Sequence, residues 1–131
     1  MRLSGPTLDA ADVPELTRFY EELLGWEVTD REGPRPGDRP GDGWAMLRPP
    51  DRSTKIEIQF EEHFARPVWP TRTGVQGMQI HLDIWVDDVA RGVEWATECG
   101  AAEAGTQPEG RDPSRLRVML DPAGHPFCLW S

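Results

Sequence analysis

The sequence has little of what several classes of protein need. It contains two cysteines in 131 residues, too few for a framework of disulfides. No apolar run approaches the ~20 residues of a membrane-spanning helix, and the first residues lack the long apolar stretch of a signal peptide. Basic residues are also few, 14 against 23 acidic ones, so nucleic acid and membranes are not expected as partners. These features indicate a cytoplasmic, single-domain protein.

Six tryptophans and an internal repeat are the positive features of the chain. Residues 8–13 (LDAADV) and 84–89 (IWVDDV) are alike, and each is followed by a helical pattern that ends at a glycine, Gly25 or Gly100. The strand-like segments that follow are 44–47 and 55–60 in the first copy and 115–120 and 126–130 in the second. A strand–helix–strands unit that occurs twice predicts two like modules, with the ligand bound where they meet.

The repeat divides the chain into module one (1–62), a connecting loop (63–77) and module two (78–131). In module one, Asp12 and Glu15 form a capping box at the start of a helix. An apolar stripe at helical spacing follows, made of Leu16, Phe19, Tyr20 and Leu23. Each module therefore contains one amphipathic helix that must cover one face of its sheet.

The strand segments alternate, which gives each sheet two different faces. Over 78–86 the even-numbered residues are apolar, and we expect the second helix to cover such a face with a side that includes Trp95. The opposite face is predicted to bind a ligand through Trp44, Glu57, Gln59, His81, Asp83, Trp85, Arg117, Met119, Cys128 and Trp130. Such a face can also be merely solvated, or it can be a dimer interface that buries the tryptophans.

The segments that carry these patterns resemble a known superfamily. Residues 7–12 and 19–26 resemble the opening of the vicinal oxygen chelate proteins, which include glyoxalase I, extradiol dioxygenases and the bleomycin and fosfomycin resistance proteins. Residues 81–88 resemble their second-module strand, and 121–127 (DPAGHPF) resemble their terminal turn, closest to the glyoxalase-like branch. The resemblance implies an α+β fold of two βαβββ modules forming a cupped mixed sheet with the helices on its convex face, often completed in a homodimer.

The same resemblance bears on a metal cofactor. Metal-dependent members place ligands on the first strand of each module and on the fourth strand of one or both. In this sequence those positions fall at Ser4 or Gly5, at His81, at Glu57 or Gln59, and at Cys128. A catalytic divalent metal usually needs at least three protein donors, and neither Ser4 nor Gly5 is a plausible ligand. We therefore expect no cofactor; if a metal binds, its ligands would be Glu57, His81 and Cys128.

Two classes of function follow from these expectations. The first is a non-catalytic binding protein that confers antibiotic resistance by sequestering a bulky aromatic or polycyclic ligand in a tryptophan-lined concave pocket. The alternative is a metal-dependent lyase, isomerase or dioxygenase of the same superfamily. A third possibility is a regulatory or structural dimer with no small ligand.

Overall fold

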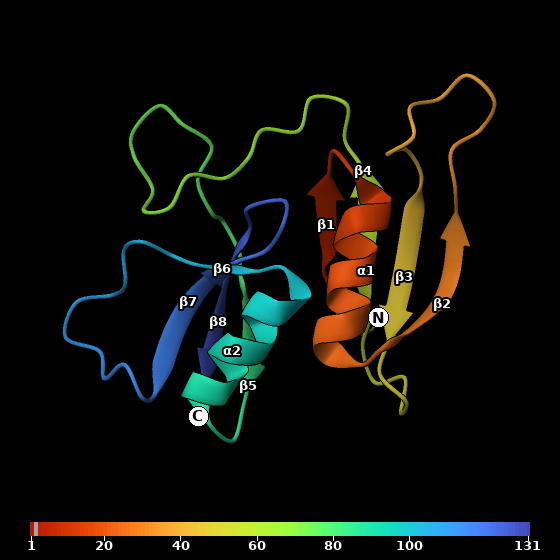
Figure 1. Cartoon of the computed structure of the whole chain (residues 1–131). Helices are drawn as coiled ribbons and strands as arrows, with labels where there is room; N and C mark the ends of the chain where they lie inside the picture. Colours follow the sequence, from red (N-terminus) through yellow and green to blue (C-terminus); the bar gives the residue numbers. More distant parts are fainter. Residues whose placement is uncertain (2) are drawn as a thin grey trace. The chain divides into compact units, whose positions relative to one another are not determined.

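The structure of the chain is a computed structural model that describes residue 1 and residues 3–131. The chain divides into two compact units, Met1–Phe64 and Ala65–Ser131. Each unit contains one α-helix and one four-stranded sheet (Figure 1). Neither of the helices described is long and apolar enough to span a membrane.

The first unit is a βαβββ module. Its elements are β1 (Thr7–Ala10), α1 (Val13–Leu24), β2 (Glu27–Glu32), β3 (Trp44–Arg48) and β4 (Ile56–Phe60). The sheet order is β1-β4-β3-β2, with β1 parallel to β4 and the other neighbours antiparallel. In the parallel pair Thr7 lies opposite Glu57, and this register fixes which residues share a face of the sheet.

The second unit repeats this plan. Its elements are β5 (Leu82–Trp85), α2 (Val89–Cys99), β6 (Ala102–Glu103), β7 (Leu116–Leu120) and β8 (Pro126–Trp130). The sheet order is β5-β8-β7-β6, and β5 is again parallel to its neighbour β8. The predicted α+β fold of two βαβββ modules is confirmed, and each module forms its own four-stranded mixed sheet.

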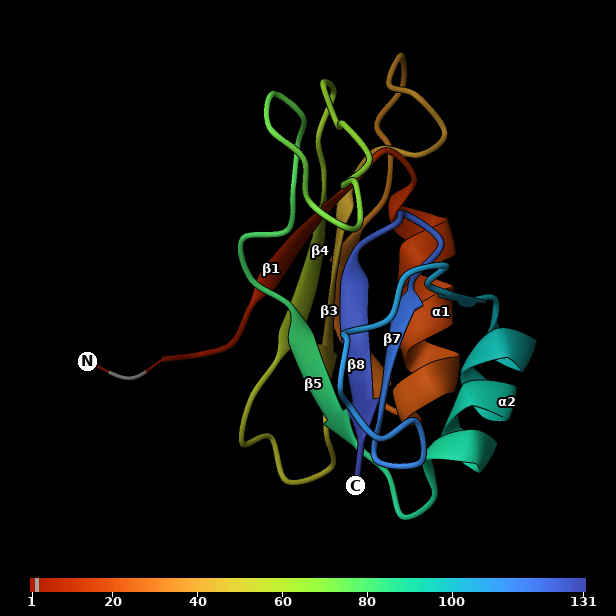
Figure 2. The same cartoon turned by 90° about the vertical axis from the view of Figure 1, so that its left-hand side faces the viewer.

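Local sequence explains where α1 begins and ends. The Asp12 carboxylate accepts a hydrogen bond of 2.9 Å from the backbone N–H of Glu15, which satisfies one of the unpaired donors of the first turn. Gly25 ends the helix with a φ of 63°, a left-handed conformation that favours glycine. The predicted stripe is the buried side, with Leu16, Phe19 and Tyr20 each 1% exposed. Figure 2 shows that each helix lies along one side of its own sheet.

The second helix differs from the prediction in one residue. Asp88 caps it by accepting a 3.1 Å hydrogen bond from the backbone N–H of Arg91, and Val89 and Ala96 are buried. Trp95, which we expected in the buried layer, is 49% exposed. Trp95 is adjacent to Ala96, and neighbouring residues are about 100° apart around a helix. The side chain that faces the sheet at this turn is therefore the small one.

Two strand predictions also need correction. The alternation over 78–86 predicted one strand, but β5 begins only at Leu82, and Ile80 is 84% exposed. The ladder to β8 begins with Leu82 opposite Phe127, and the preceding residue of β8 is Pro126, which has no N–H to extend the ladder. The short β6 was not predicted, because two residues are too few to show alternation.

Candidate functional site

In module one, the sheet face opposite α1 carries three of the predicted site residues, Trp44, Glu57 and Gln59. The register places Trp44 opposite Gln59 and Met46 opposite Glu57. The residues that alternate with them are buried: Ala45, Leu47, Ile56 and Ile58. The open face holds a hollow of about 400 Å³ lined by Gly43, Trp44, Met46, Glu57, Gln59 and Phe60. This hollow combines aromatic and polar groups, as small-ligand sites do.

The two polar residues of this hollow already have partners within the module. Glu57 forms an ion pair with Lys55, and the two side chains are only 24% and 13% exposed. The Gln59 side-chain amide donates a 2.8 Å hydrogen bond to the carboxylate of Asp9 on β1. A ligand that seeks the Glu57 carboxylate must therefore displace or share the Lys55 ammonium.

Gly5 precedes β1 and lies against the backbone of Lys55. Its φ is 150°, and a Cβ there would lie 2.0 Å from the Lys55 carbonyl oxygen and 2.9 Å from Lys55 Cγ. Only glycine fits, because real Cβ atoms do not approach other atoms so closely. The family's first-strand ligand position therefore offers no side chain in module one, and Lys55 occupies the adjoining space.

Trp44 is fixed at its polar edge by Glu32. The indole Nε1–H donates a 3.3 Å hydrogen bond to Glu32 Oε2, and the other carboxylate oxygen accepts a 2.9 Å bond from Arg35 Nε. Hydrogen bonds from Arg35 and then from Trp44 lower the pKa of the Glu32 carboxyl. The carboxylate thus holds the indole of Trp44 at the rim of the open face.

In module two, β5 and β8 bring together two predicted tryptophans. Trp85 lies opposite Trp130 in the parallel register, so their side chains share a face. The two rings pack edge to face, with centroids 4.7 Å apart and an interplanar angle of 89°. Nevertheless Trp85 is 59% exposed and Trp130 41% exposed. This pair leaves a large aromatic surface in contact with solvent.

Three further predicted residues meet beside this pair. Asp83 lies opposite Cys128 in the register, and His81 is two residues before Asp83, a spacing that places both on one side of the chain. His81 Nε2 is 3.0 Å from Asp83 Oδ1, and one potential ligand atom from each of the three residues lies within 4.8 Å of the others. This His81–Asp83–Cys128 cluster contains one nitrogen, one oxygen and one sulfur donor.

Cys128 is held as a thiol in this arrangement. Burial raises the pKa of the Cys128 thiol to about 11, and the charge and hydrogen bond of Asp83 act in the same direction. A thiol with a raised pKa is a weak nucleophile at neutral pH, because the thiolate is the reactive form. The site therefore does not favour cysteine-based nucleophilic catalysis.

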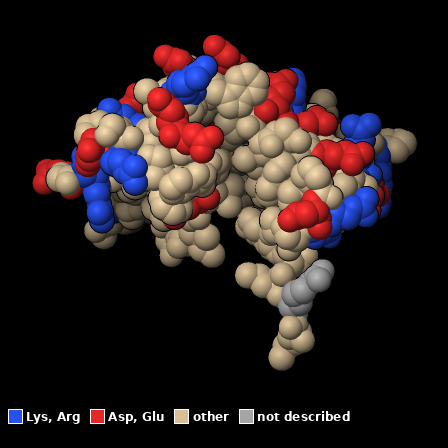
Figure 3. Space-filling view, turned by 90° about the horizontal axis from the view of Figure 1, so that it is seen from below, with Lys and Arg blue, Asp and Glu red and all other residues tan. Residues whose placement is uncertain are grey.

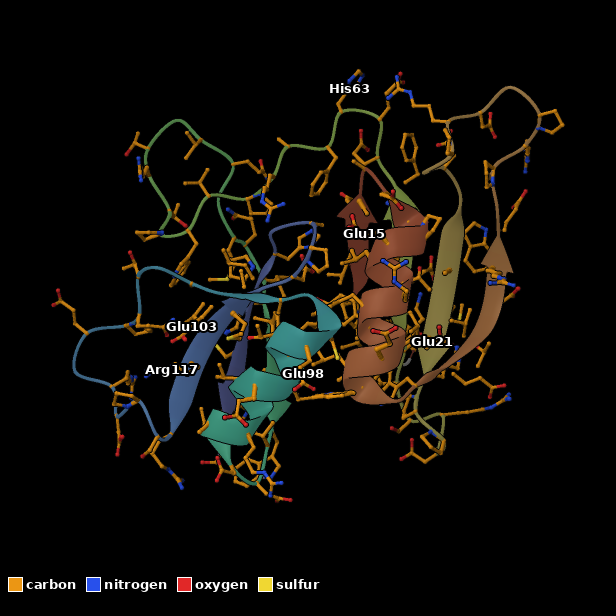
Figure 4. The ribbon with its side chains drawn as sticks, in the orientation of Figure 1. Glu15, Glu21, His63, Glu98, Glu103 and Arg117 are labelled. Atoms are coloured by element: carbon orange, nitrogen blue, oxygen red, sulfur yellow. The ribbon has the colours of Figure 1, made fainter. Side chains whose placement is uncertain are left out.

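Arg117 and Met119 do not lie on this face, and their predicted placement is wrong. Cys128 pairs with Val118, whereas Arg117 pairs with Leu129 and Met119 with Phe127, so both belong to the other side of the sheet. Met119 is fully buried, and Arg117 Nε forms a 3.0 Å ion pair with Glu103 Oε1 of β6 (Figure 4). The alternation within β7 was correct, but both of its faces carry apolar residues. The sequence pattern alone therefore could not show which face meets the helix.

The modules differ in whether they fit a metal ion. The strand registers make Glu57 and Cys128 equivalent, opposite Thr7 and Asp83 respectively. In module one the candidate Glu57 is neutralised by Lys55, and no donor exists at Gly5. In module two the His81–Asp83–Cys128 cluster supplies three donors, so a metal fits that module by its donor set.

Sequence reasoning missed Lys55 altogether. Lys55 lies two residues before Glu57, so strand alternation places both side chains on one face, and their opposite charges could have identified the pair.

The side chain of His63 projects from the loop after β4, away from the strands of its module (Figure 4). On the face drawn in Figure 3, acidic and basic side chains are interspersed among the described residues. Selectivity for a charged ligand must then come from local groups such as the Lys55–Glu57 ion pair.

Comparison with known proteins identifies the family to which this fold belongs. Two βαβββ modules of this kind define the glyoxalase, bleomycin resistance and dioxygenase (vicinal oxygen chelate) superfamily. Residues 6–130 match the family described as glyoxalase-like domain, and the chain belongs to that family. A search of the curated proteins found no match.

Solved structures share the fold. A glyoxalase family protein from Enterococcus faecalis is 24% identical, with a TM-score of 0.68 over 99% of this chain and 97% of its own. The fosfomycin resistance protein FosX from Mesorhizobium loti is 18% identical, with a TM-score of 0.66 over 98% and 90%. The trypanothione-dependent glyoxalase I of Leishmania major is 19% identical, with a TM-score of 0.66 over 100% and 86%. At these identities the likeness concerns the fold.

Proposed function

We propose that the protein binds a bulky aromatic small molecule and sequesters it without transforming it, as an antibiotic-resistance protein would. The observation that carries this proposal is the exposed edge-to-face pair of Trp85 and Trp130. Large aromatic side chains left exposed on a sheet forfeit the free energy of burial unless something covers them. A planar ligand that stacks on this pair would recover it. The resistance protein among the fold neighbours is in keeping with this function.

Polar groups beside the pair would orient such a ligand. Asp83 shares the face with Trp85, and its side chain is 60% exposed, so its carboxylate is accessible to a cationic or hydrogen-bonding group. Module one, taken by itself, carries a separate aromatic surface at Trp44, with Gln59 beside it in the hollow of that module. Each aromatic contact adds about 0.5–1.5 kcal/mol beyond the burial of area.

The test is a fluorescence titration with ethidium, a planar aromatic cation that serves as the probe. We expect ethidium to quench tryptophan fluorescence, and Trp85→Ala to weaken its binding by roughly tenfold or more, since stacking and burial are both lost. Trp95→Ala is the matched control, because Trp95 is similarly exposed but lies on α2. Equal affinity in wild type and Trp85→Ala, or an equal loss in Trp95→Ala, would contradict the proposal.

A second copy of the chain is the competing occupant of the tryptophan pair. If a homodimer interface covers Trp85 and Trp130, Trp85→Ala shifts the protein towards the monomer in sedimentation velocity. Ethidium quenching of the wild type would then be weak and would increase on dilution. Sequestration instead predicts that the oligomeric state is unchanged by this substitution.

The His81–Asp83–Cys128 cluster favours a second candidate function, that of a metal-dependent lyase, isomerase or dioxygenase. A bound divalent cation would polarise an oxygen of the substrate as a Lewis acid. His81, Asp83 and Cys128 would hold the cation, and the neighbouring tryptophans would position an apolar substrate. Product formation in the presence of metal, lost on His81→Gln, would favour this function over sequestration.

A further inference from the structure

We propose that module two by itself binds a zinc-class transition metal ion, with His81, Asp83 and Cys128 as its three protein ligands. This ligand set differs from the one that the family resemblance implies, because Asp83 replaces Glu57. The inference concerns metal binding alone, and it holds whether the protein sequesters its ligand or transforms it.

The geometry of the strands assembles these ligands. His81 and Asp83 are two residues apart in extended chain, and Cys128 is directly opposite Asp83 on β8. Their donor atoms lie within 4.8 Å of one another, and the closest pair, His81 Nε2 and Asp83 Oδ1, is 3.0 Å apart. Ligand atoms around tetrahedral zinc are separated by roughly 3.3–3.8 Å. Because His81 and Asp83 are exposed, small side-chain rotations can bring the sulfur to that separation.

The donor types determine the class of metal. One imidazole nitrogen, one carboxylate oxygen and one thiolate sulfur suit Zn²⁺ or Co²⁺, whereas Mg²⁺ and Mn²⁺ prefer oxygen ligands. Binding converts the Cys128 thiol to a metal-bound thiolate and releases its proton to solvent. Three protein ligands leave a fourth position open for water or for an oxygen of a small ligand.

Module one contains its own cation at the equivalent place, which argues against Glu57 as a ligand. The Lys55 ammonium pairs with Glu57, and the position that corresponds to His81 is Gly5, where no side chain fits. In module two the residue that corresponds to Lys55 is Pro126, which carries no charge. The strand position that carries a cation in module one is therefore uncharged in module two, and no lysine competes with a metal ion there.

Cobalt serves as the spectroscopic probe. Adding Co²⁺ to the whole protein should produce a near-ultraviolet charge-transfer band that requires a thiolate ligand. Cys128→Ser should abolish this band, whereas Cys99→Ser, the matched control on α2, should keep it. No charge-transfer band in the wild type, or a band that survives Cys128→Ser, overturns the proposal.

Calorimetric titration with Zn²⁺ tests the other two ligands. His81→Gln and Asp83→Asn should each weaken Zn²⁺ binding by roughly tenfold or more. The matched controls His63→Gln and Asp87→Asn should not weaken Zn²⁺ binding, and Mg²⁺ in excess should not compete with Zn²⁺.

The Glu57→Gln variant should bind Zn²⁺ as the wild type does. A loss of affinity in this variant would restore the family ligand set and overturn the proposed one. Circular dichroism of each variant identifies any that fail to fold, and the cobalt spectrum of Cys99→Ser still tests the site in that event.

The outcome is separable from the proposed sequestration. Ethidium binding reports on Trp85, which is not a metal ligand in this scheme. Metal binding that fails while ethidium still quenches fluorescence refutes only the metal site. A thiolate band without ethidium binding refutes only the aromatic ligand.

Discussion

Lys55 forms an ion pair with Glu57 on the open face of module one, and both side chains are mostly shielded from water. In this module the carboxylate at the position where the family resemblance implies a metal ligand is paired with a lysine of the same strand segment. The backbone of Lys55 also excludes any side chain at Gly5. The two modules therefore share one fold but differ in chemistry, and the difference arises from single residues at equivalent positions.

Replacing Lys55 with methionine should destabilise the fold by on the order of 2–3 kcal/mol, because the Glu57 carboxylate is left partly buried without its partner. The loss of stability should be smaller than for a fully buried ion pair, because the Glu57 side chain is 24% exposed. Chemical denaturation measures the change in the free energy of unfolding. The control is the double variant Lys55→Met with Glu57→Leu, in which no charge is left unpaired. It should recover most of the loss, and a double variant as unstable as the single one would attribute the effect to packing instead.

The Glu32 carboxylate should titrate below the ordinary range of a glutamate. Hydrogen bonds from Arg35 and Trp44 depress its pKa, so its contribution to stability is present above the unfolded-state pKa and is lost as pH falls through the lower folded-state pKa. The NMR shift of the Trp44 indole N–H, followed from pH 7 downwards, should report a midpoint below the ordinary pKa of a glutamate. Arg35→Gln should raise the midpoint, because it removes the main cause of the shift. An unchanged midpoint would mean that Arg35 does not hold this carboxylate.

The edge-to-face contact of Trp85 and Trp130 should give a measurable optical signal. Two indoles with centroids 4.7 Å apart couple their transitions, so the near-ultraviolet circular dichroism should change strongly in Trp130→Ala. Trp130→Phe keeps an aromatic ring at the contact and should retain the stability that Trp130→Ala loses, about 0.5–1.5 kcal/mol. If the two variants are equally stable, the aromatic contact contributes nothing of its own to stability.

Much of the fold could be predicted from the sequence because it depends on local signals. The Asp12 and Asp88 caps, the glycines that end the helices and the apolar stripe of α1 are each visible within about two turns of helix. The repeat then fixes the topology, because the same order of elements occurs twice. Trp95 shows the limit of this reasoning, since a single position around a helix decides whether a side chain is buried or exposed.

The candidate site was harder to predict because it depends on register between distant strands. Asp83 and Cys128 are neighbours only through the parallel pairing of β5 with β8, and no local pattern shows which residues face each other. The same uncertainty misplaced Arg117 and Met119, whose strand carries apolar residues on both faces. Lys55 lies within the predicted strand 55–60, and its alternation with Glu57 could have placed it on the open face.

Gly5 should tolerate no side chain, and this is the sharpest test of the difference between the modules. Its φ of 150° is in a region almost confined to glycine, and alanine there would place Cβ 2.0 Å from the Lys55 carbonyl oxygen. The backbone strain alone costs about 1–3 kcal/mol, and the clash adds to it, so Gly5→Ala should lower the free energy of unfolding by at least that amount. Gly33→Ala is the matched control, because a Cβ at Gly33 meets nothing within 4 Å, and it should change stability by no more than about 0.5 kcal/mol. If Gly5→Ala is as stable as Gly33→Ala, the N-terminal segment does not approach Lys55. The first-strand ligand position of module one would then have room for a side chain.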